Sequence, residues 1–173
     1  MLIIFTGNGK GKTTAALGQA LRSVGDGKKV LMVEFIKGPW KSGEDASSKK
    51  FKPNFKIVKS GLGFVGIGGD KLPLKDHARA AANGLEYARK EIRKKKWNIV
   101  ILDEVWNAVH LKLLTKRQIS DFIKESLPHL EHLIMTGRDC PKEFVKIADL
   151  VTEMIEIKHP FKKNIKGKRG LEY

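Results

Sequence analysis

Short apolar runs recur along the chain, separated by longer stretches in which apolar residues return every three or four positions. The runs are continuous and rich in β-branched residues. Strands that are apolar on both faces are typical of a parallel sheet with helices on either side. The pattern therefore predicts strands at residues 2–5, 30–33, 99–102 and 133–135.

The stretches between these runs carry the period of amphipathic helices. Thr115 and Gln118 have the form of a capping box, so we expect a helix from there to about Leu127, before Pro128. Residues 151–158 alternate apolar and polar side chains, which predicts a last, more exposed strand. The other predicted helices cover residues 13–23, 74–95 and 141–148.

The alternation of strands and helices implies right-handed crossovers. It predicts one doubly wound α/β domain with a mainly parallel sheet and flanking helices. We expect this single domain to span residues 1–173. Residues 37–73 are rich in glycine, proline and serine, and we interpret them as a mobile loop region, since a loop of that length in a compact domain is commonly functional. Residues 159–173 are expected to form a C-terminal tail.

Composition narrows the classes of function. The formal net charge is +15, but the lysines are spread over many segments without a zinc-finger or RNA-binding pattern, so no nucleic-acid partner is expected. No apolar run approaches the roughly 18 residues that cross a bilayer. Gly7 interrupts the apolar start, so neither a membrane span nor a signal peptide is predicted. The single cysteine, Cys140, excludes an internal disulfide and favours a cytoplasmic location.

A glycine-rich loop lies between the first predicted strand and the first predicted helix. In this context the backbone N–H groups converge on phosphate oxygens, and the helix presents its positive end. Only three residues separate Gly7 from Gly11, one fewer than in the usual motif, so the nucleotide is expected to lie differently from that of ordinary ATPases. The predicted phosphate-binding residues are Gly7, Asn8, Gly9, Lys10, Gly11, Lys12, Thr13 and Thr14.

Two further polar segments follow predicted strands. Asp103 and Glu104 come directly after the strand at 99–102, where a carboxylate can hold Mg²⁺ together with the Thr13 hydroxyl. Arg138 follows the strand at 133–135, and its guanidinium can grip phosphate oxygens. Because ligands of open α/β sheets bind beyond the carboxyl ends of the strands, these residues are predicted to share one site.

These segments together resemble the ATP:corrinoid adenosyltransferases. The likeness runs in order along nearly the whole chain, and the tight loop joined to the later segments makes it specific. The segments that carry it are Gly7 to Gly18, Glu34 to Gly38, Gly61 to Phe64, Leu102 to Val105, Thr136 to Arg138, Ala148 to Met154, Lys158 to Phe161 and Gly170 to Tyr173.

The resemblance implies a RecA-like fold and transfer of the 5′-deoxyadenosyl group of ATP to the cobalt(I) of a corrinoid, with release of triphosphate. It implies Mg²⁺ or Mn²⁺ held by Thr13 and Glu104, with Asp103 beside them, and phosphate contacts from Lys12 and Arg138. It also implies a homodimer and a possible flavoprotein reductant.

The corrinoid side of the site departs from the family pattern. The family's flexible loop usually carries a phenylalanine and, two residues on, a tryptophan. Here Phe64 is present and Gly66 stands in the tryptophan position. We predict that Phe64 packs against the lower face of the corrin, with help from another aromatic residue such as Trp40. Two other readings stay open: a RecA-like ATPase, and a protein that binds ATP or corrinoid without adenosyl transfer.

Overall fold

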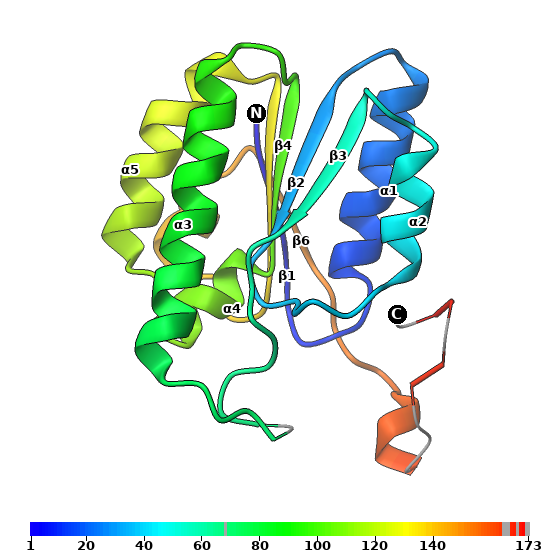
Figure 1. Ribbon diagram of the computed structural model, residues 1–173, viewed down its shortest axis with the longest axis vertical. Helices are drawn as coiled ribbons and strands as arrows, with labels where there is room; N and C mark the ends of the chain where they lie inside the picture. Colours follow the sequence, from blue (N-terminus) through cyan, green and yellow to red (C-terminus); the bar gives the residue numbers. More distant parts are fainter. Residues whose placement is uncertain (68, 164–166, 169, 172–173) are drawn as a thin grey trace.

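The computed structural model describes residues 1–67, 69–163, 167–168 and 170–171. Within these residues the chain forms a sheet whose strand pairs are all parallel (Figure 1). The strand order is β3-β2-β4-β5-β1-β6, so the first strand lies between the last two. The strands are β1 (Leu2–Thr6), β2 (Val30–Glu34), β3 (Phe55–Lys59), β4 (Ile99–Asp103), β5 (His132–Thr136) and β6 (Leu150–Glu153).

Helices cover both faces of the sheet, with α1 and α2 on one side and α3 and α5 on the other (Figure 1). The predicted doubly wound α/β fold is therefore confirmed. The helices are α1 (Lys12–Gly25), α2 (Gly43–Lys49), α3 (Leu74–Arg93), α4 (Val105–His110), α5 (Lys116–Ser126) and α6 (Lys142–Ile147). Short 3₁₀ turns occupy Leu127–His129 and Pro160–Lys163.

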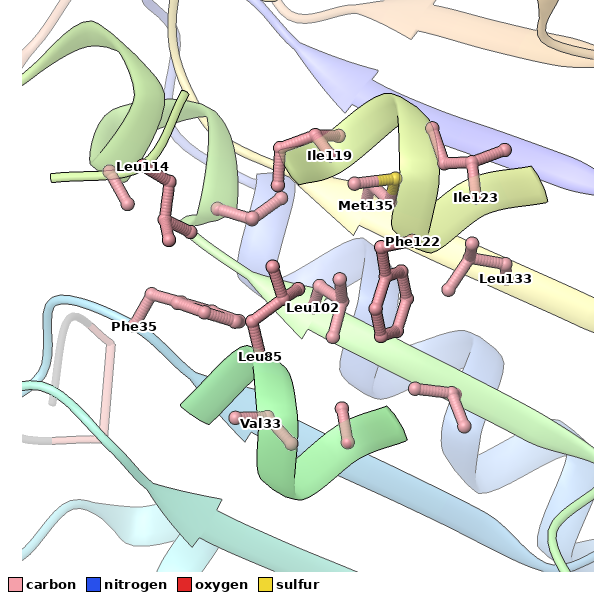
Figure 2. Packing of buried hydrophobic residues seen from close by; sticks show 14 of the residues in the cluster. Val33, Phe35, Leu85, Leu102, Leu114, Ile119, Phe122, Ile123, Leu133 and Met135 are labelled. Atoms are coloured by element: carbon pink, nitrogen blue, oxygen red, sulfur yellow. The ribbon is translucent and has the colours of Figure 1, made fainter. Parts of the chain in front are cut away.

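Successive side chains along a strand point to opposite faces of the sheet and pack into two separate hydrophobic cores. In β4, Val100 and Leu102 face α3 and α5, whereas Ile99 and Ile101 face α1. Figure 2 shows the larger core, where Phe122 of α5 and Leu85 of α3 meet the strand residues. Burying both faces of every central strand explains why these strands are apolar without alternation.

The predicted strands and helices are present, with ends that differ by a few residues. The Thr115 capping box is confirmed, because the Thr115 side chain accepts a hydrogen bond from the Gln118 backbone. The last predicted strand is shorter than expected and ends at Glu153. Helix α4, between β4 and α5, was not predicted.

The interpretation of residues 37–73 as one loop was wrong, because α2 and β3 lie inside this segment. Of the C-terminal tail, residues 164–166, 169, 172 and 173 lie outside the described part of the chain. Among the described residues, no helix has the length and apolar character needed to cross a membrane.

Candidate active site

Four neighbouring strands end on a buried polar residue at the same edge of the sheet. These residues are Thr6, Glu34, Asp103 and Thr136, which close β1, β2, β4 and β5 and are at most 9% exposed. Glu34 and Asp103 lie opposite each other in the parallel register. Polar groups are costly to bury, so a row of them at the carboxyl ends of parallel strands marks this edge as the ligand-binding one.

The glycine loop leaves β1 at this edge and enters α1. Gly7 and Gly11 adopt φ values of 94° and 121°, which side-chain-bearing residues rarely reach. A side chain on Gly7 would also overlap the backbone of Met154, which follows β6. The Gly9 N–H donates to the Met154 carbonyl at 2.7 Å. The segment after β6 therefore braces the loop, a contact that the sequence analysis did not foresee.

Lys12 folds back over this loop. Its Nζ donates to the carbonyl oxygens of Gly7 and Gly9, both at 2.7 Å. Burial lowers the pKa of Lys12, and the charge of Arg138 lowers it further, against the opposing effect of Glu104 and Asp103. The ammonium group is thus held at the mouth of the loop, close to a second cation.

Arg138 follows β5, two residues after Thr136. Its backbone N–H donates to Asn107 Oδ1 at 2.8 Å, and its side chain is exposed. Since its charge acts on Lys12, the structure brings together two predicted phosphate ligands from segments that are far apart in the sequence. Two cations that repel each other at one edge favour an anion between them. Asn107, one turn after Asp103, was missed by the sequence analysis.

Asp103 is fully buried at the end of β4 and is held by two threonine hydroxyls. Thr136 Oγ1 donates to Oδ1 at 2.7 Å, and Thr13 Oγ1 donates to Oδ2 at 3.2 Å. Burial raises the pKa of Asp103, whereas Lys37 and both threonines oppose the rise. Thr136 Oγ1 also accepts the Glu104 N–H at 2.9 Å. Thr13 and Asp103 therefore meet as predicted, and Thr136 links them to Glu104.

Glu104 occupies the N-cap position of α4 with a left-handed backbone, φ 59°. Burial raises the pKa of Glu104 to about 7, and the neighbouring charge of Asp103 adds to the rise. A strained backbone that holds a half-buried carboxyl group beside another carboxylate is typical of functional sites. The two carboxyl groups form an electronegative patch next to the Thr13 hydroxyl.

Glu34, Lys37 and Glu44 form an ion-pair network that the sequence analysis missed. Lys37 Nζ lies 2.8 Å from Glu34 Oε1 and also contacts Glu44 Oε1. Burial raises the pKa of Glu34 to about 7, and Lys37 opposes the rise. Glu34 Oε2 is buried without a hydrogen-bond partner. The sequence signal that could have indicated this network is Glu34, a charged residue at the end of the apolar run of β2.

The hard-oxygen groups of this edge suit a small divalent cation. They comprise the Thr13 hydroxyl and the carboxyl groups of Asp103 and Glu104, whose pKa values are raised mainly by burial. No cluster of three or more His, Cys, Asp or Glu residues able to hold a metal occurs in the described part of the chain.

Phe64 lies on the segment between β3 and α3 and is 57% exposed. Its ring stands 5.9 Å from the ring of Trp40, which is 61% exposed on the loop after β2. No hydrogen bond or ring contact among the described residues joins Phe64 to the glycine loop. The structure thus pairs Phe64 with the aromatic residue that the sequence analysis named as its helper.

These features define the class of the protein. A glycine loop runs from a parallel strand into a helix, and a lysine closes over it. An aspartate at the end of β4, which β5 separates from β1, accepts a hydrogen bond from the hydroxyl of the residue after that lysine. The fold and the site together are those of a P-loop nucleotide-binding protein.

Comparison with known proteins identifies the family. The sequence profile of the family described as "ATP:corrinoid adenosyltransferase BtuR/CobO/CobP" matches residues 1–173. A corrinoid adenosyltransferase from Sinorhizobium sp is 36% identical over 177 residues, covering 100% of this chain and 80% of the relative. The corrinoid adenosyltransferase of Escherichia coli K12 is 34% identical, and that of Salmonella typhimurium 32%, each with 100% of this chain and 85% of the relative covered. The chain belongs to the ATP:corrinoid adenosyltransferase family.

Proposed function

We propose that this enzyme transfers the 5′-deoxyadenosyl group of ATP to the cobalt(I) of a corrinoid, in the synthesis or salvage of adenosylcobalamin. The structural observation that carries the proposal is the Lys12 ammonium, held over the carbonyls of the shortened glycine loop beside Arg138. This arrangement is a cationic cradle for a polyphosphate. Family membership over the whole chain supplies the corrinoid as the second substrate.

The chemistry asks little of the side chains beyond orientation and charge. The electron pair of cobalt(I) forms a bond to the ribose C5′, and the C5′–O bond breaks with its electrons passing to triphosphate. Burial raises the pKa of Cys140, the single cysteine, to about 12, so its thiol is no competing nucleophile. The enzyme accelerates the reaction by holding C5′ in line with cobalt and stabilising the charge of the leaving group.

In this proposal residues 7–14 hold the triphosphate, as their converging N–H groups and the start of α1 allow. Lys12 moves from the loop carbonyls onto phosphate oxygens, and Arg138 contacts the same chain of phosphates. Thr13 and Glu104 would ligate Mg²⁺ or Mn²⁺, with Asp103 orienting the Thr13 hydroxyl. When bound, the metal neutralises phosphate charge and so favours departure of triphosphate.

Phe64 is proposed to meet the lower face of the corrin and disfavour the axial ligand of cobalt. The exposure of Phe64 supports this role, because a phenylalanine that is 57% exposed is not part of the hydrophobic core. The surrounding segment is rich in glycine, and Gly63, Gly66 and Gly69 have positive φ. We propose that this part of the 37–73 region moves when the corrinoid binds.

The oligomeric state and partners are also proposed. We propose that two copies of the chain pair through the edge strand β6. All four residues of β6 are exposed, and Ile155 and Ile157, which follow it, are 75% and 87% exposed. Light scattering on the purified protein tests the dimer. We further propose a cytoplasmic location, which the single cysteine favours, and a flavoprotein that supplies the electron for cobalt(I).

The proposed reaction is tested by anaerobic incubation with chemically reduced cobalamin and MgATP. Formation of a cobalt–carbon bond, seen in the absorption spectrum, together with one triphosphate per turnover, is the expected result. ADP and phosphate would instead indicate a RecA-like ATPase. Binding of ATP or corrinoid without any product would indicate a carrier protein.

A further inference from the structure

Trp40 and Phe64 form a pair of exposed aromatic rings on loops that leave the sheet at its carboxyl edge, where the glycine loop also begins. They come from different loops, after the neighbouring strands β2 and β3. Their ring centroids are 5.9 Å apart with an interplanar angle of 32°. Large apolar side chains that are more than half exposed and gathered in one place mark a surface that binds something.

Two glycines create the place for the Trp40 ring. A Cβ atom on Gly63, next to Phe64, would lie 2.8 Å from Trp40 Cη2, and one on Gly38 would lie 2.6 Å from Trp40 Cζ3. Real Cβ atoms essentially never approach so closely. The indole therefore rests on bare backbone from both loops, and one of these contacts is immediately beside Phe64.

The backbone of Trp40 is tied to regular structure. Lys59, the last residue of β3, donates from Nζ to the Trp40 carbonyl at 2.5 Å and to Asp45 Oδ2 at 2.6 Å. Asp45 also accepts the Ser42 N–H at 2.8 Å, which closes the capping box of α2. Trp40 is thus held through its backbone carbonyl and through its ring, which packs on Gly38 and Gly63. Phe64 lies in a glycine-rich segment, and its side chain is held by the contact with the Trp40 ring.

We propose that Trp40 is the positioning residue for Phe64, and that the two tilted rings together offer the corrinoid one apolar surface. A corrin ring is broad and flat, so two tilted rings cover more of it than one. The second ring thus comes from the loop after β2, while position 66 carries glycine. This inference rests on the proposed role of Phe64 at the corrinoid.

The test compares Trp40→Ala, Trp40→Phe, Phe64→Ala and the double alanine variant in steady-state kinetics. Trp40→Ala is expected to raise KM for cob(II)alamin roughly tenfold, the upper range for a lost aromatic pair, with KM for ATP unchanged. Trp40→Phe restores most of the loss. The double variant loses less than the sum of the two single losses, because part of the effect of Trp40 is exerted through Phe64. Ile67→Ala, on the same segment and 65% exposed, is the matched control and leaves both constants unchanged.

Tryptophan fluorescence gives a readout that does not depend on turnover. Trp97 and Trp106 are 6% and 0% exposed, so quenching by acrylamide reports mainly on Trp40. Phe64→Ala should increase this quenching in the free enzyme, whereas Ile67→Ala should not. Thermal unfolding shows that each variant is folded, and Trp40→Leu replaces Trp40→Ala if the latter is not.

The outcomes separate this inference from the role of Phe64 on which it rests. If Phe64→Ala raises KM for the corrinoid and Trp40→Ala does not, the positioning role of Trp40 is wrong while that of Phe64 stands. If neither variant changes this KM, both roles are wrong. If Trp40→Ala raises KM for ATP equally, Trp40 supports the nucleotide side instead, and the inference is overturned.

Discussion

Replacing Thr136 by valine removes one hydroxyl from the buried edge of the sheet while keeping the shape of the side chain. In the structure this hydroxyl donates to Asp103 Oδ1 at 2.7 Å and accepts the Glu104 N–H at 2.9 Å. Thr136 and Asp103 are both 0% exposed, so water does not replace the lost bonds. The variant leaves a buried carboxylate oxygen and a backbone N–H without these partners.

A bond to a charged group contributes about 1.5–3 kcal/mol, and an unsatisfied buried donor costs about 1–3 kcal/mol. Together these effects predict a loss of roughly 2–5 kcal/mol of unfolding free energy. For a chain of this size that corresponds to a fall in Tm of roughly 5–20 °C. Thr136→Ser keeps the hydroxyl and loses one methyl group, so it should cost only about 1 kcal/mol.

Differential scanning calorimetry on the two variants measures the difference, and its pH dependence gives a second check. Burial raises the pKa of Asp103 in the folded state, so the folded protein binds this proton more tightly and stability falls as pH rises through that pKa. Removing the Thr136 bond raises the pKa of Asp103 further. The valine variant's deficit should therefore grow with pH. Equal Tm values for Thr136→Val and Thr136→Ser would refute this account of the edge.

Four other changes probe the site. Lys12→Ala should lower kcat/KM roughly 30- to 1000-fold, the effect of losing about 2–4 kcal/mol of transition-state stabilisation, in a protein that remains folded; near-normal activity would exclude the phosphate role. Glu104→Gln should weaken the response to Mg²⁺ more than Glu104→Asp, and a titration curve like the parent's would exclude a metal ligand. Phe64→Ala should impair reaction from cob(II)alamin with a mild reductant more than from prepared cob(I)alamin, whereas equal losses or weaker ATP binding would overturn the proposed role of Phe64. Burial raises the pKa of Glu34 to about 7, so ionisation of Glu34 lowers the free energy of unfolding as pH rises from about 4.5 to 7. Glu34→Gln should remove up to about 3 kcal/mol of that decline, measured by urea unfolding at a series of pH values. Parallel plots of unfolding free energy against pH for the variant and the parent would contradict this prediction.

The sheet and its main helices could be predicted because burial on both faces leaves a signal within each segment. The apolar runs within β1, β2, β4 and β5 are continuous. The capping box at Thr115 marks the start of α5 in the sequence. The signal fails where burial is partial. Helix α2 has the sequence GEDASSK and no apolar face. Strand β3, at the edge of the sheet, has the sequence FKIVK, in which two lysines break up the apolar residues.

The candidate site divides in the same way. Lys12, Thr13 and Asp103 stand in local motifs, and the carboxyl-edge rule for parallel sheets was enough to bring them together. The contacts of Met154 with the glycine loop, and of Trp40 with Gly63, depend on how distant segments pack. No spacing within a single segment encodes such contacts, so they become visible only in three dimensions.

The position of β1 has a consequence for the order in which the protein folds during synthesis. The first strand made pairs only with β5 and β6, whose residues follow about 130–150 positions later. Until the ribosome has produced residue 154, the glycine loop lacks the Met154 carbonyl that binds its Gly9 N–H. The nascent amino terminus must therefore stay without its partner strands through most of translation, and we expect ATP binding only near its end. A ribosome-bound chain halted before β6 should fail to retain ATP even though its entire glycine loop has been synthesised.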